Sequence, residues 1–349
     1  MSDGEAGESF VRRAREALNE MRLQDALRLF DDAESAGYEP DICAAGRWTC
    51  HMLCGQFEKA WEESDSIERR GRPDPHRFWD GTPFRGKHVM IRCLHGLGDT
   101  IQFIRFVPLI RQEAETVTLE AQPGLKSLLA QTGIADHVMT WGEREPYWNQ
   151  QVEINELPKI FRVTENTIPD APHVAITKLR VPGTRNGAGK KKIGLVWSAS
   201  AYNPLRSIRL QQLTRLLDLP GLSFYSLQAG SACEQLRSWT GRIENLSEHA
   251  ADVLETAVNM SAMDLVITVD TMAAHLGGAS GLPTWILLPF ACDWRWMARR
   301  ADSPWYPSVR LFRQQTPGAW EPVIHQVVQA LDTLQQWKSS SSRATEFTR

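Results

Sequence analysis

A histidine and an aspartate flank two glycines in the segment His95-Gly96-Leu97-Gly98-Asp99. The apolar run before it, 89–94, predicts a buried strand, and the run after it, 100–109, has apolar residues at helical spacing. A strand that turns into a helix leaves backbone N–H groups unpaired at the helix start, where an anionic ligand group can bind. Gly96 and Gly98 allow positive φ and the close approach of a ligand to the backbone. On spacing alone, Asp99 is predicted to be the N-cap of this helix.

A second acid stands at the same kind of junction near the C-terminus. Asp270-Thr271 ends the apolar run 265–269 and precedes a short helical run that contains His275. The start of this helix is a second anion site by its geometry, although either residue could serve only as an N-cap. His275 lies one turn inside, as a buried, hydrogen-bonded histidine or as the wall of a ligand pocket. The adjacent glycines, 277 and 278, are expected to allow close packing of the helix.

The first glycine turn lacks the third glycine of the GxGxxG dinucleotide fingerprint. A strand–turn–helix of this kind also occurs in NAD-dependent oxidoreductases, but the missing glycine makes that function the weaker hypothesis for this chain.

Two blocks of the sequence resemble a known family. HGLGDTIQFIRF, from His95, resembles the N-terminal signature of glycosyltransferase family nine, the ADP-heptose:lipopolysaccharide heptosyltransferase-like enzymes, and DLVITVDTMAAHLGGASGLPTW, from Asp264, resembles its C-terminal signature. The resemblance implies a GT-B arrangement of two Rossmann-like domains, with the acceptor on the first and the nucleotide sugar mainly on the second. Trp294, Arg295 and Trp296 also resemble a family element.

The resemblance assigns roles to individual residues. It implies that Asp99 is the base, that Arg206 lies near the donor diphosphate, and that Asp270 and Thr271 contact the donor. Arginine suits bidentate phosphate binding, although Arg206 could equally be a surface residue. Further polar residues at predicted strand ends are assigned to the nucleotide site: Ser198, Ser200 and Gln228. The chain especially resembles the family's members that are fused to tetratricopeptide repeats, which often carry Glu-Gln before Gly-Leu-Gly-Asp, whereas this chain has Leu94-His95. His95 either replaces that polar pair, as a second candidate proton acceptor, or marks a different acceptor.

These assignments predict an inverting glycosyltransferase that uses a nucleotide-diphospho-sugar, with ADP-heptose as the first candidate. The acceptor is a glycan, a lipid or a protein. No cofactor or metal is required if the protein supplies the positive charge that stabilises the leaving diphosphate. The other hypothesis is a repeat-containing scaffold that keeps the fold without turnover.

The order of predicted helices and strands along the chain divides it into domains. Residues 1–72 read as helices, in which Leu23-Gln24-Asp25-Ala26 recurs as Phe57-Glu58-Lys59-Ala60, the 34-residue period of tetratricopeptide repeats. This segment is either a surface for protein docking or self-association, or a helical cap on the next domain. Linkers at 72–75 and 181–189 bound two α/β domains, 78–180 and 190–337, and the Ser-rich end, 338–349, is predicted to be disordered.

Composition narrows the class of protein. The 349 residues carry a net charge of −3, so nucleic acid is not expected as the main partner. The acidic N-terminus and the lack of a long apolar run predict a cytoplasmic protein. Six cysteines in a chain of this length do not make a disulfide framework, and no four Cys or His ligands stand at the spacing of a metal site.

Overall fold

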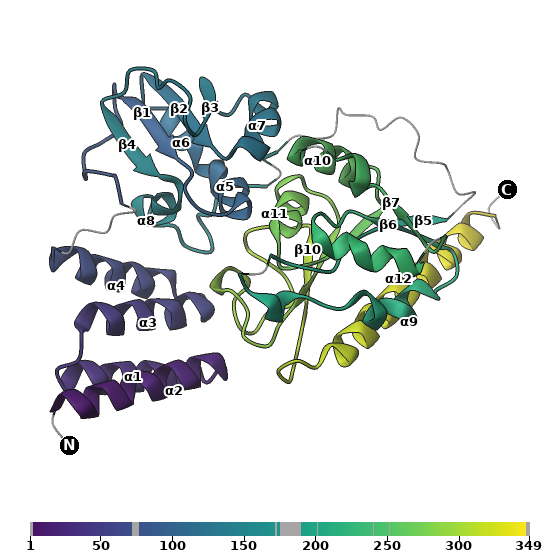
Figure 1. Ribbon diagram of the computed structural model, residues 1–349, viewed down its shortest axis with the longest axis horizontal. Helices are drawn as coiled ribbons and strands as arrows, with labels where there is room; N and C mark the ends of the chain where they lie inside the picture. Colours follow the sequence, from purple (N-terminus) through teal and green to yellow (C-terminus); the bar gives the residue numbers. More distant parts are fainter. Residues whose placement is uncertain are drawn as a thin grey trace.

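The computed structural model describes residues 3–71, 77–171, 173–174, 190–200, 202–239, 241–250 and 252–346. The two predicted linkers, 72–75 and 181–189, fall outside these residues. The described chain forms a helical segment (3–71), a first domain (77–174) and a second domain (190–346), which lie against one another (Figure 1). No helix among the described residues is long and apolar enough to span a bilayer.

The backbone conformation of the helical segment repeats with a period of 34 residues. Met21 and Gly55, 34 residues apart, both have positive φ, and so do Gly37 and Gly71. Each of these residues follows a helix, where a left-handed residue ends the hydrogen-bonded turns. The small alanines of the predicted repeat are fully buried where the helices pack. Its four helices are α1 (Asp3–Asn19), α2 (Leu23–Ser35), α3 (Pro40–Leu53) and α4 (Phe57–Arg69).

The first domain is a four-stranded parallel sheet in the order β3-β2-β1-β4. The strand order changes direction between β1 and β4, so the carboxyl ends of these two strands border a crevice. Its strands are β1 (His88–Arg92), β2 (Thr116–Ala121), β3 (His137–Thr140) and β4 (Gln150–Glu153), and its α-helices are α5 (Leu97–Phe103), α6 (Val107–Arg111), α7 (Lys126–Thr132) and α8 (Leu157–Ile160).

The helix predicted at 100–109 differs from the one observed. It starts earlier, at Leu97, and breaks into α5, a 3-10 turn at Ile104–Phe106 and α6. Pro108 stands in the first turn of α6 and has no N–H to donate to the preceding turn, so a continuous helix cannot run through it.

The second domain is a six-stranded parallel sheet in the order β10-β9-β8-β5-β6-β7. Read from β7, this is the strand order of dinucleotide-binding folds, with its switch point between β5 and β8. Its strands are β5 (Lys191–Val196), β6 (Leu222–Ser226), β7 (Ile243–Asn245), β8 (Leu265–Val269), β9 (Thr284–Leu288) and β10 (Val309–Arg313), and its α-helices are α9 (Thr214–Leu217), α10 (Val253–Ser261), α11 (Met272–Ala279) and α12 (Trp320–Glu346).

Two elements of the second domain are short or irregular. Strand β7 has three residues, too few to show a period in the sequence. A 3-10 helix, Ser231–Trp239, precedes it. Helix α12 continues to Glu346, past the predicted disordered end at 338, because neither proline nor glycine interrupts the run after its first turn.

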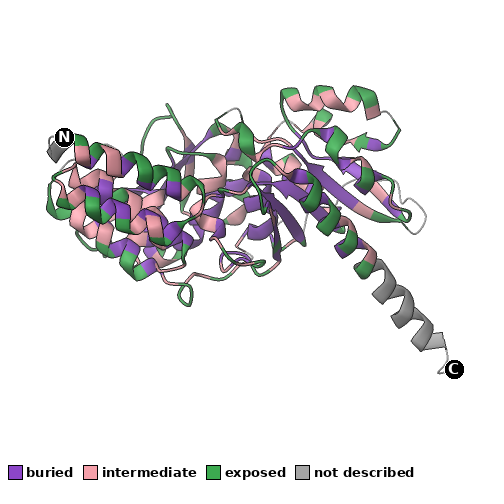
Figure 2. Cartoon of the chain, turned by 90° about the horizontal axis from the view of Figure 1, so that it is seen from below, coloured by how far each residue is buried: buried purple, intermediate pink, exposed green. Residues whose placement is uncertain are grey.

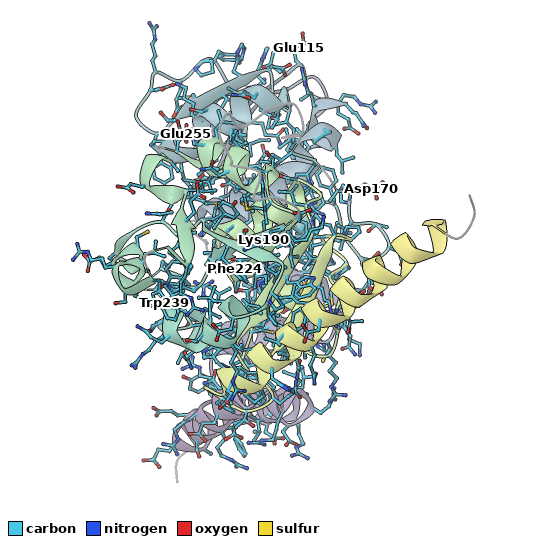
Figure 3. All side chains as sticks on the ribbon, turned by 90° about the vertical axis from the view of Figure 1, so that its right-hand side faces the viewer. Glu115, Asp170, Lys190, Phe224, Trp239 and Glu255 are labelled. Carbon is cyan, nitrogen blue, oxygen red and sulfur yellow. The ribbon has the colours of Figure 1, made fainter. Side chains whose placement is uncertain are left out.

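One hydrophobic core joins all three units. It contains Leu53 and Trp61 of the helical segment, Ile91 of the first sheet and Ile286 of the second. Figure 2 shows the buried residues concentrated in the strands and in the helix faces that cover them. Side chains fill the space between the layers (Figure 3), and Phe224 of β6 is 5% exposed. The predicted fold class, two Rossmann-like domains after a short helical segment, is confirmed.

The shared core also bears on the two alternatives for the helical segment. Because its side chains complete the core of both α/β domains, the segment acts as a helical cap. Docking of a protein partner on its outer face stays a prediction.

Candidate functional site

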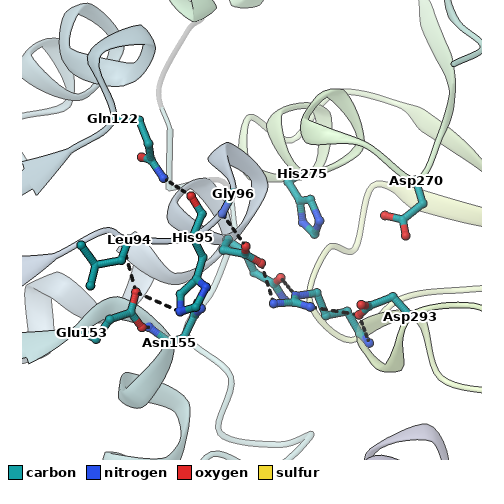
Figure 4. A network of polar contacts seen from close by, with 12 residues as sticks. Leu94, His95, Gly96, Gln122, Glu153, Asn155, Asp270, His275 and Asp293 are labelled. Carbon is teal, nitrogen blue, oxygen red and sulfur yellow. Dashed lines mark hydrogen bonds and ion pairs between the residues drawn. The ribbon is translucent and has the colours of Figure 1, made fainter. Parts of the chain in front are cut away.

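The two switch points bring together most of the residues singled out in the sequence. His95, Gly96 and Asp99 follow β1, and Arg206 and Asp270 follow β5 and β8. Helix α5 of the first domain packs against α11 of the second, so the two switch points lie at a common boundary. Figure 4 shows His95 and Gly96 on the side of the first domain and Asp270, His275 and Asp293 on the side of the second.

Asp99 is the third residue of α5, and the N-cap is Gly96. Its Oδ2 accepts a hydrogen bond from the Gly96 backbone N–H at 2.9 Å, and its Oδ1 accepts one from Arg295 Nη2 at 2.6 Å (Figure 4). The prediction that Asp99 is the N-cap is therefore wrong by three residues. The helix starts earlier because Gly96 can take the extended conformation that an N-cap needs while the Asp99 carboxylate supplies the missing acceptor.

Arg295 crosses the domain boundary. It lies in a 3-10 turn at Trp294–Trp296, and it donates to Asp99, to Gln102 Oε1 at 2.8 Å and to Asp293 Oδ1 at 3.0 Å. Burial opposes the charge of Arg295, but Asp293 and Asp99 outweigh burial and raise its pKa. Burial likewise opposes ionisation of Asp293, and Arg295 outweighs it, so the pKa of Asp293 is lowered. This group is an ionised network that ties the domains together.

A second acid lies behind His95. Glu153 ends β4 and is 1% exposed, and its carboxylate accepts from the backbone N–H groups of Leu94 and Asn155. His95 Nε2 lies 3.8 Å from Glu153 Oε1 and is itself open to solvent (Figure 4). Burial raises the pKa of Glu153 to about 7, with a smaller contribution from the negative charges of Glu156 and Asp99. A carboxyl group with a pKa near neutrality can hold or release a proton at physiological pH, so Glu153 is a further candidate for moving a proton at this site.

Gly98 lets the two domains touch. A Cβ at this position would lie 2.7 Å from Cδ2 of His275 in α11. Neither Gly96 nor Gly98 has positive φ, and the close approach of His275 is what requires a glycine at position 98. His275 is the buried, hydrogen-bonded alternative: its Nδ1 lies 3.0 Å from the Tyr306 hydroxyl, and burial lowers its pKa to about 3.

At the second switch point, Arg206 faces Asp270. Arg206 Nη1 lies 3.4 Å from Asp270 Oδ2, and Asp270 is 3% exposed. Burial raises the pKa of Asp270, and the negative charge of Asp293 acts in the same direction against Arg206. Thr271 is the N-cap of α11, because its hydroxyl accepts from the Ala273 N–H at 3.2 Å. Thr271 is therefore the N-cap and Asp270 is not, and contact of either residue with a donor stays a prediction.

Gln228 organises the turn after β5. Its Oε1 accepts from the backbone N–H groups of Trp197 and Ser198, and its Nε2 donates to two backbone carbonyls. All four hydrogen bonds available to the amide are therefore made within the protein. The Ser198 hydroxyl contacts the Ala199 carbonyl and the Ser207 hydroxyl, whereas Ser200 is exposed. Of the three, Ser200 has its side chain most open to a ligand.

The expected close packing of Gly277 and Gly278 is observed. A Cβ at Gly277 would lie 2.3 Å from Thr284 Oγ1, and one at Gly278 would lie 2.3 Å from the Tyr306 ring. Within the described ranges, no group of three or more His, Cys, Asp or Glu side chains is arranged to hold a metal ion.

Comparison with known proteins adds the following. No protein-family model matches the chain. Protein FlbA of Caulobacter vibrioides is 27% identical over 333 residues, which is 82% of this chain, and the chain spans about half (54%) of that relative's length. The chain is similar to the glycosyl transferase family 9 structure from Veillonella parvula, with 12% identity, a TM-score of 0.49 and coverage of 72% of this chain and 98% of that one.

The chain is likewise similar to E. coli ADP-heptose LPS heptosyltransferase II, with 12% identity, a TM-score of 0.49 and coverage of 72% of this chain and 99% of that one.

The sequence reasoning missed Glu153 and Asp293. Glu153 carries a signal that could have been used, an acid at the carboxyl end of a short strand beside the switch point. Asp293 stands in an irregular segment between β9 and β10, where no period marks it. The place of Arg295 opposite Asp99, 196 residues away along the chain, has no local signal at all.

Proposed function

We propose that the protein is an inverting, metal-independent glycosyltransferase that moves a sugar from a nucleotide-diphospho-sugar to an acceptor hydroxyl. The observation that carries the proposal is the meeting of two chemically different switch points at one domain boundary. The first presents the carboxylate of Asp99, and the second presents Arg206 beside the start of α11. Glycosyl transfer needs a proton acceptor on one side of the anomeric carbon and positive charge on the other.

Arg206 is the group that we assign to the diphosphate. Its partner Asp270 has a raised pKa because burial disfavours its charge, so Arg206 balances a carboxylate that is costly to bury. A diphosphate offers the guanidinium a second anion with bidentate geometry. The N–H groups at the start of α11, next to Thr271, supply further donors. Fixed positive charge of this kind stabilises a leaving diphosphate without a metal ion.

Asp99 is the group that we assign to the acceptor proton. In transfer with inversion, the acceptor oxygen bonds to the anomeric carbon as the bond to the diphosphate oxygen breaks on the opposite face, and the hydroxyl proton passes to the base. Each carboxylate oxygen has two acceptor positions, so Asp99 can accept one further hydrogen bond at each oxygen beside those from Gly96 and Arg295. Arg295 holds the carboxylate in one orientation.

The second candidate function is a scaffold that keeps the fold without turnover. One observation favours it: both carboxylate oxygens of Asp99 already have protein partners. A scaffold would use the Arg295–Asp99 pair only to fasten the domains. The two candidates differ in whether a nucleotide sugar is consumed.

The test is a thermal-shift screen of the whole chain with nucleoside diphosphates and nucleotide sugars, ADP-heptose among them, followed by a transfer assay with each donor that stabilises it. The expected result is stabilisation by ADP-linked sugars and release of the nucleoside diphosphate when an acceptor is added. If nothing in the panel stabilises the protein and no donor is consumed, the glycosyltransferase proposal fails. Stabilisation without consumption, with glycan, lipid and protein acceptors all supplied, would instead favour the scaffold.

A further inference from the structure

The segment between β9 and β10 connects the candidate site to the helical segment. It carries Arg295, whose guanidinium contacts Asp99 at 2.6 Å, and its next residues touch α3. The backbone N–H of Ala298 donates to the carbonyl of Leu53, at the end of α3, at 2.8 Å. The same irregular segment therefore faces the first domain on one side and the helical segment on the other.

An unbroken series of aromatic contacts runs along this connection. The rings of Trp61 and Trp48 have centroids 6.4 Å apart, and Trp48 meets Trp294 edge-on at 5.3 Å. The guanidinium of Arg295 lies 4.6 Å from the centroid of the Trp294 ring, within the range of a cation–π contact. The Trp294 ring is thus held between an indole of α3 and the arginine that reaches Asp99.

The helical segment holds the first domain as well. Trp61 Nε1 donates to the carbonyl of Val163 at 2.7 Å in a buried hydrogen bond. Asp65 of α4 pairs with Arg162 at 2.8 Å and with Lys159 at 3.5 Å. Because α3 contacts the second domain and α4 the first, the segment spans the boundary at which the candidate groups meet.

We propose that Trp48 is a positioning residue, through which the helical segment fixes Arg295, and hence the Asp99 carboxylate, in its working orientation. Its link to turnover rests on the proposed function. Arg295 forms a planar fork with donors to Asp99, Gln102 and Asp293, and a fork of this kind loses its hydrogen bonds when it rotates. Removal of the Trp48 ring opens space behind Trp294, which frees the Trp294–Arg295 unit to move. Misplacement of a reacting group by about 1 Å costs about 10²-fold in rate.

Trp48→Leu tests this role, with Trp239→Leu as the matched control. Both indoles are half-buried, but Trp239 packs on the other core of the second domain, in the 3-10 helix before β7 (Figure 3). We expect Trp48→Leu to lower kcat about 10- to 10²-fold with little change in KM for the donor, and Trp48→Phe, which keeps an aromatic edge, to restore most of it. Trp239→Leu should lower the melting temperature similarly and leave kcat unchanged.

A second measurement does not depend on activity. Amide hydrogen exchange across residues 293–300 should become faster in Trp48→Leu and stay unchanged in Trp239→Leu. If no donor is ever consumed by the wild type, the proposed function fails, and the exchange rates still decide whether Trp48 holds this segment. Unchanged exchange in Trp48→Leu, or an equal loss of kcat in both variants, would overturn the positioning role.

A double substitution supplies the last check. If Trp48 acts through Arg295, then Trp48→Leu should have little further effect on kcat in an Arg295→Lys background, because contacting residues are not additive. Full additivity of the two losses would contradict the inference.

Discussion

The two switch points have the same topology and opposite chemistry. After β1 and β4 the first domain presents acids and an exposed imidazole: Asp99, Glu153 and His95. After β5 and β8 the second presents Arg206 against the buried carboxylate of Asp270. The first group of side chains is suited to moving a proton, and the second to holding an anion.

The difference shows that the fold determines where a site lies, whereas the residues in the loops after the strands determine which reaction step the site can perform. Parallel strands bring their carboxyl ends to one edge in both sheets, and the residues that follow them decide which reaction step that edge can serve. Substitutions at the two switch points should therefore separate turnover from donor binding.

The largest effect is expected for Asp99→Asn. The amide keeps the shape, and its single oxygen can accept from one of the two donors, the Gly96 N–H or Arg295 Nη2, but it cannot take a proton at neutral pH. Turnover should fall about 10²–10⁴-fold, while ADP affinity stays close to that of the wild type. The measurement is the transfer rate beside ADP affinity and melting temperature. A variant that retains turnover within about threefold of the wild type, far from the loss of a base, would point to His95 with Glu153 as the proton acceptor.

Arg206→Ala should reverse this pattern. Loss of a charge-assisted contact should weaken ADP binding by about 1.5–3 kcal/mol, measured by calorimetry. The matched control is Arg215→Ala, since Arg215 is an exposed arginine of the same domain whose partner, Glu321, is also exposed. Equal ADP affinity in the wild type and Arg206→Ala would remove Arg206 from the donor site.

The raised pKa of Glu153 makes stability depend on pH. The folded state holds this proton up to a pKa of about 7, whereas the unfolded chain releases it near the ordinary value of 4.5. The folded state therefore binds more protons between these values, and the contribution of Glu153 to stability is lost as pH rises from about 4.5 to about 7. At 1.36 kcal/mol per unit the loss is at most about 3 kcal/mol.

In the Glu153→Gln variant, the side chain at position 153 does not titrate between about pH 4.5 and pH 7. The variant's free energy of unfolding, measured by urea denaturation, should rise relative to the wild type as pH increases from 5 to 8. Parallel curves for the two proteins over that range would show that Glu153 titrates normally.

The smallest effect is expected for Gly98→Ala. The added methyl would press on the His275 ring between the domains, and overpacking of this kind costs about 1–3 kcal/mol. Gly124→Ala is the control, because a Cβ there would make only an ordinary contact, at 3.9 Å from Val253. A melting temperature equally close to the wild type in both variants would show that α5 and α11 adjust freely.

The sequence by itself determined the elements and the local junctions. Short segments rich in apolar residues marked most strands, and Asp99 and Asp270 were found because strand–turn–helix junctions are local features. Arg206 was found through the family resemblance. The 34-residue offset also follows from the sequence, and it reappears as paired positive φ angles at positions 21 and 55.

Only the tertiary structure decided what these residues touch. Arg295 meets Asp99 across 196 residues of chain, and His275 occupies the space that Gly98 leaves open. The raised pKa of Glu153 likewise depends on how completely surrounding elements remove water from it. The physical reason is that hydrogen-bond geometry and desolvation depend on how segments far apart in the sequence pack together. Secondary-structure propensity and hydrophobic periodicity depend only on residues that are near one another in the sequence.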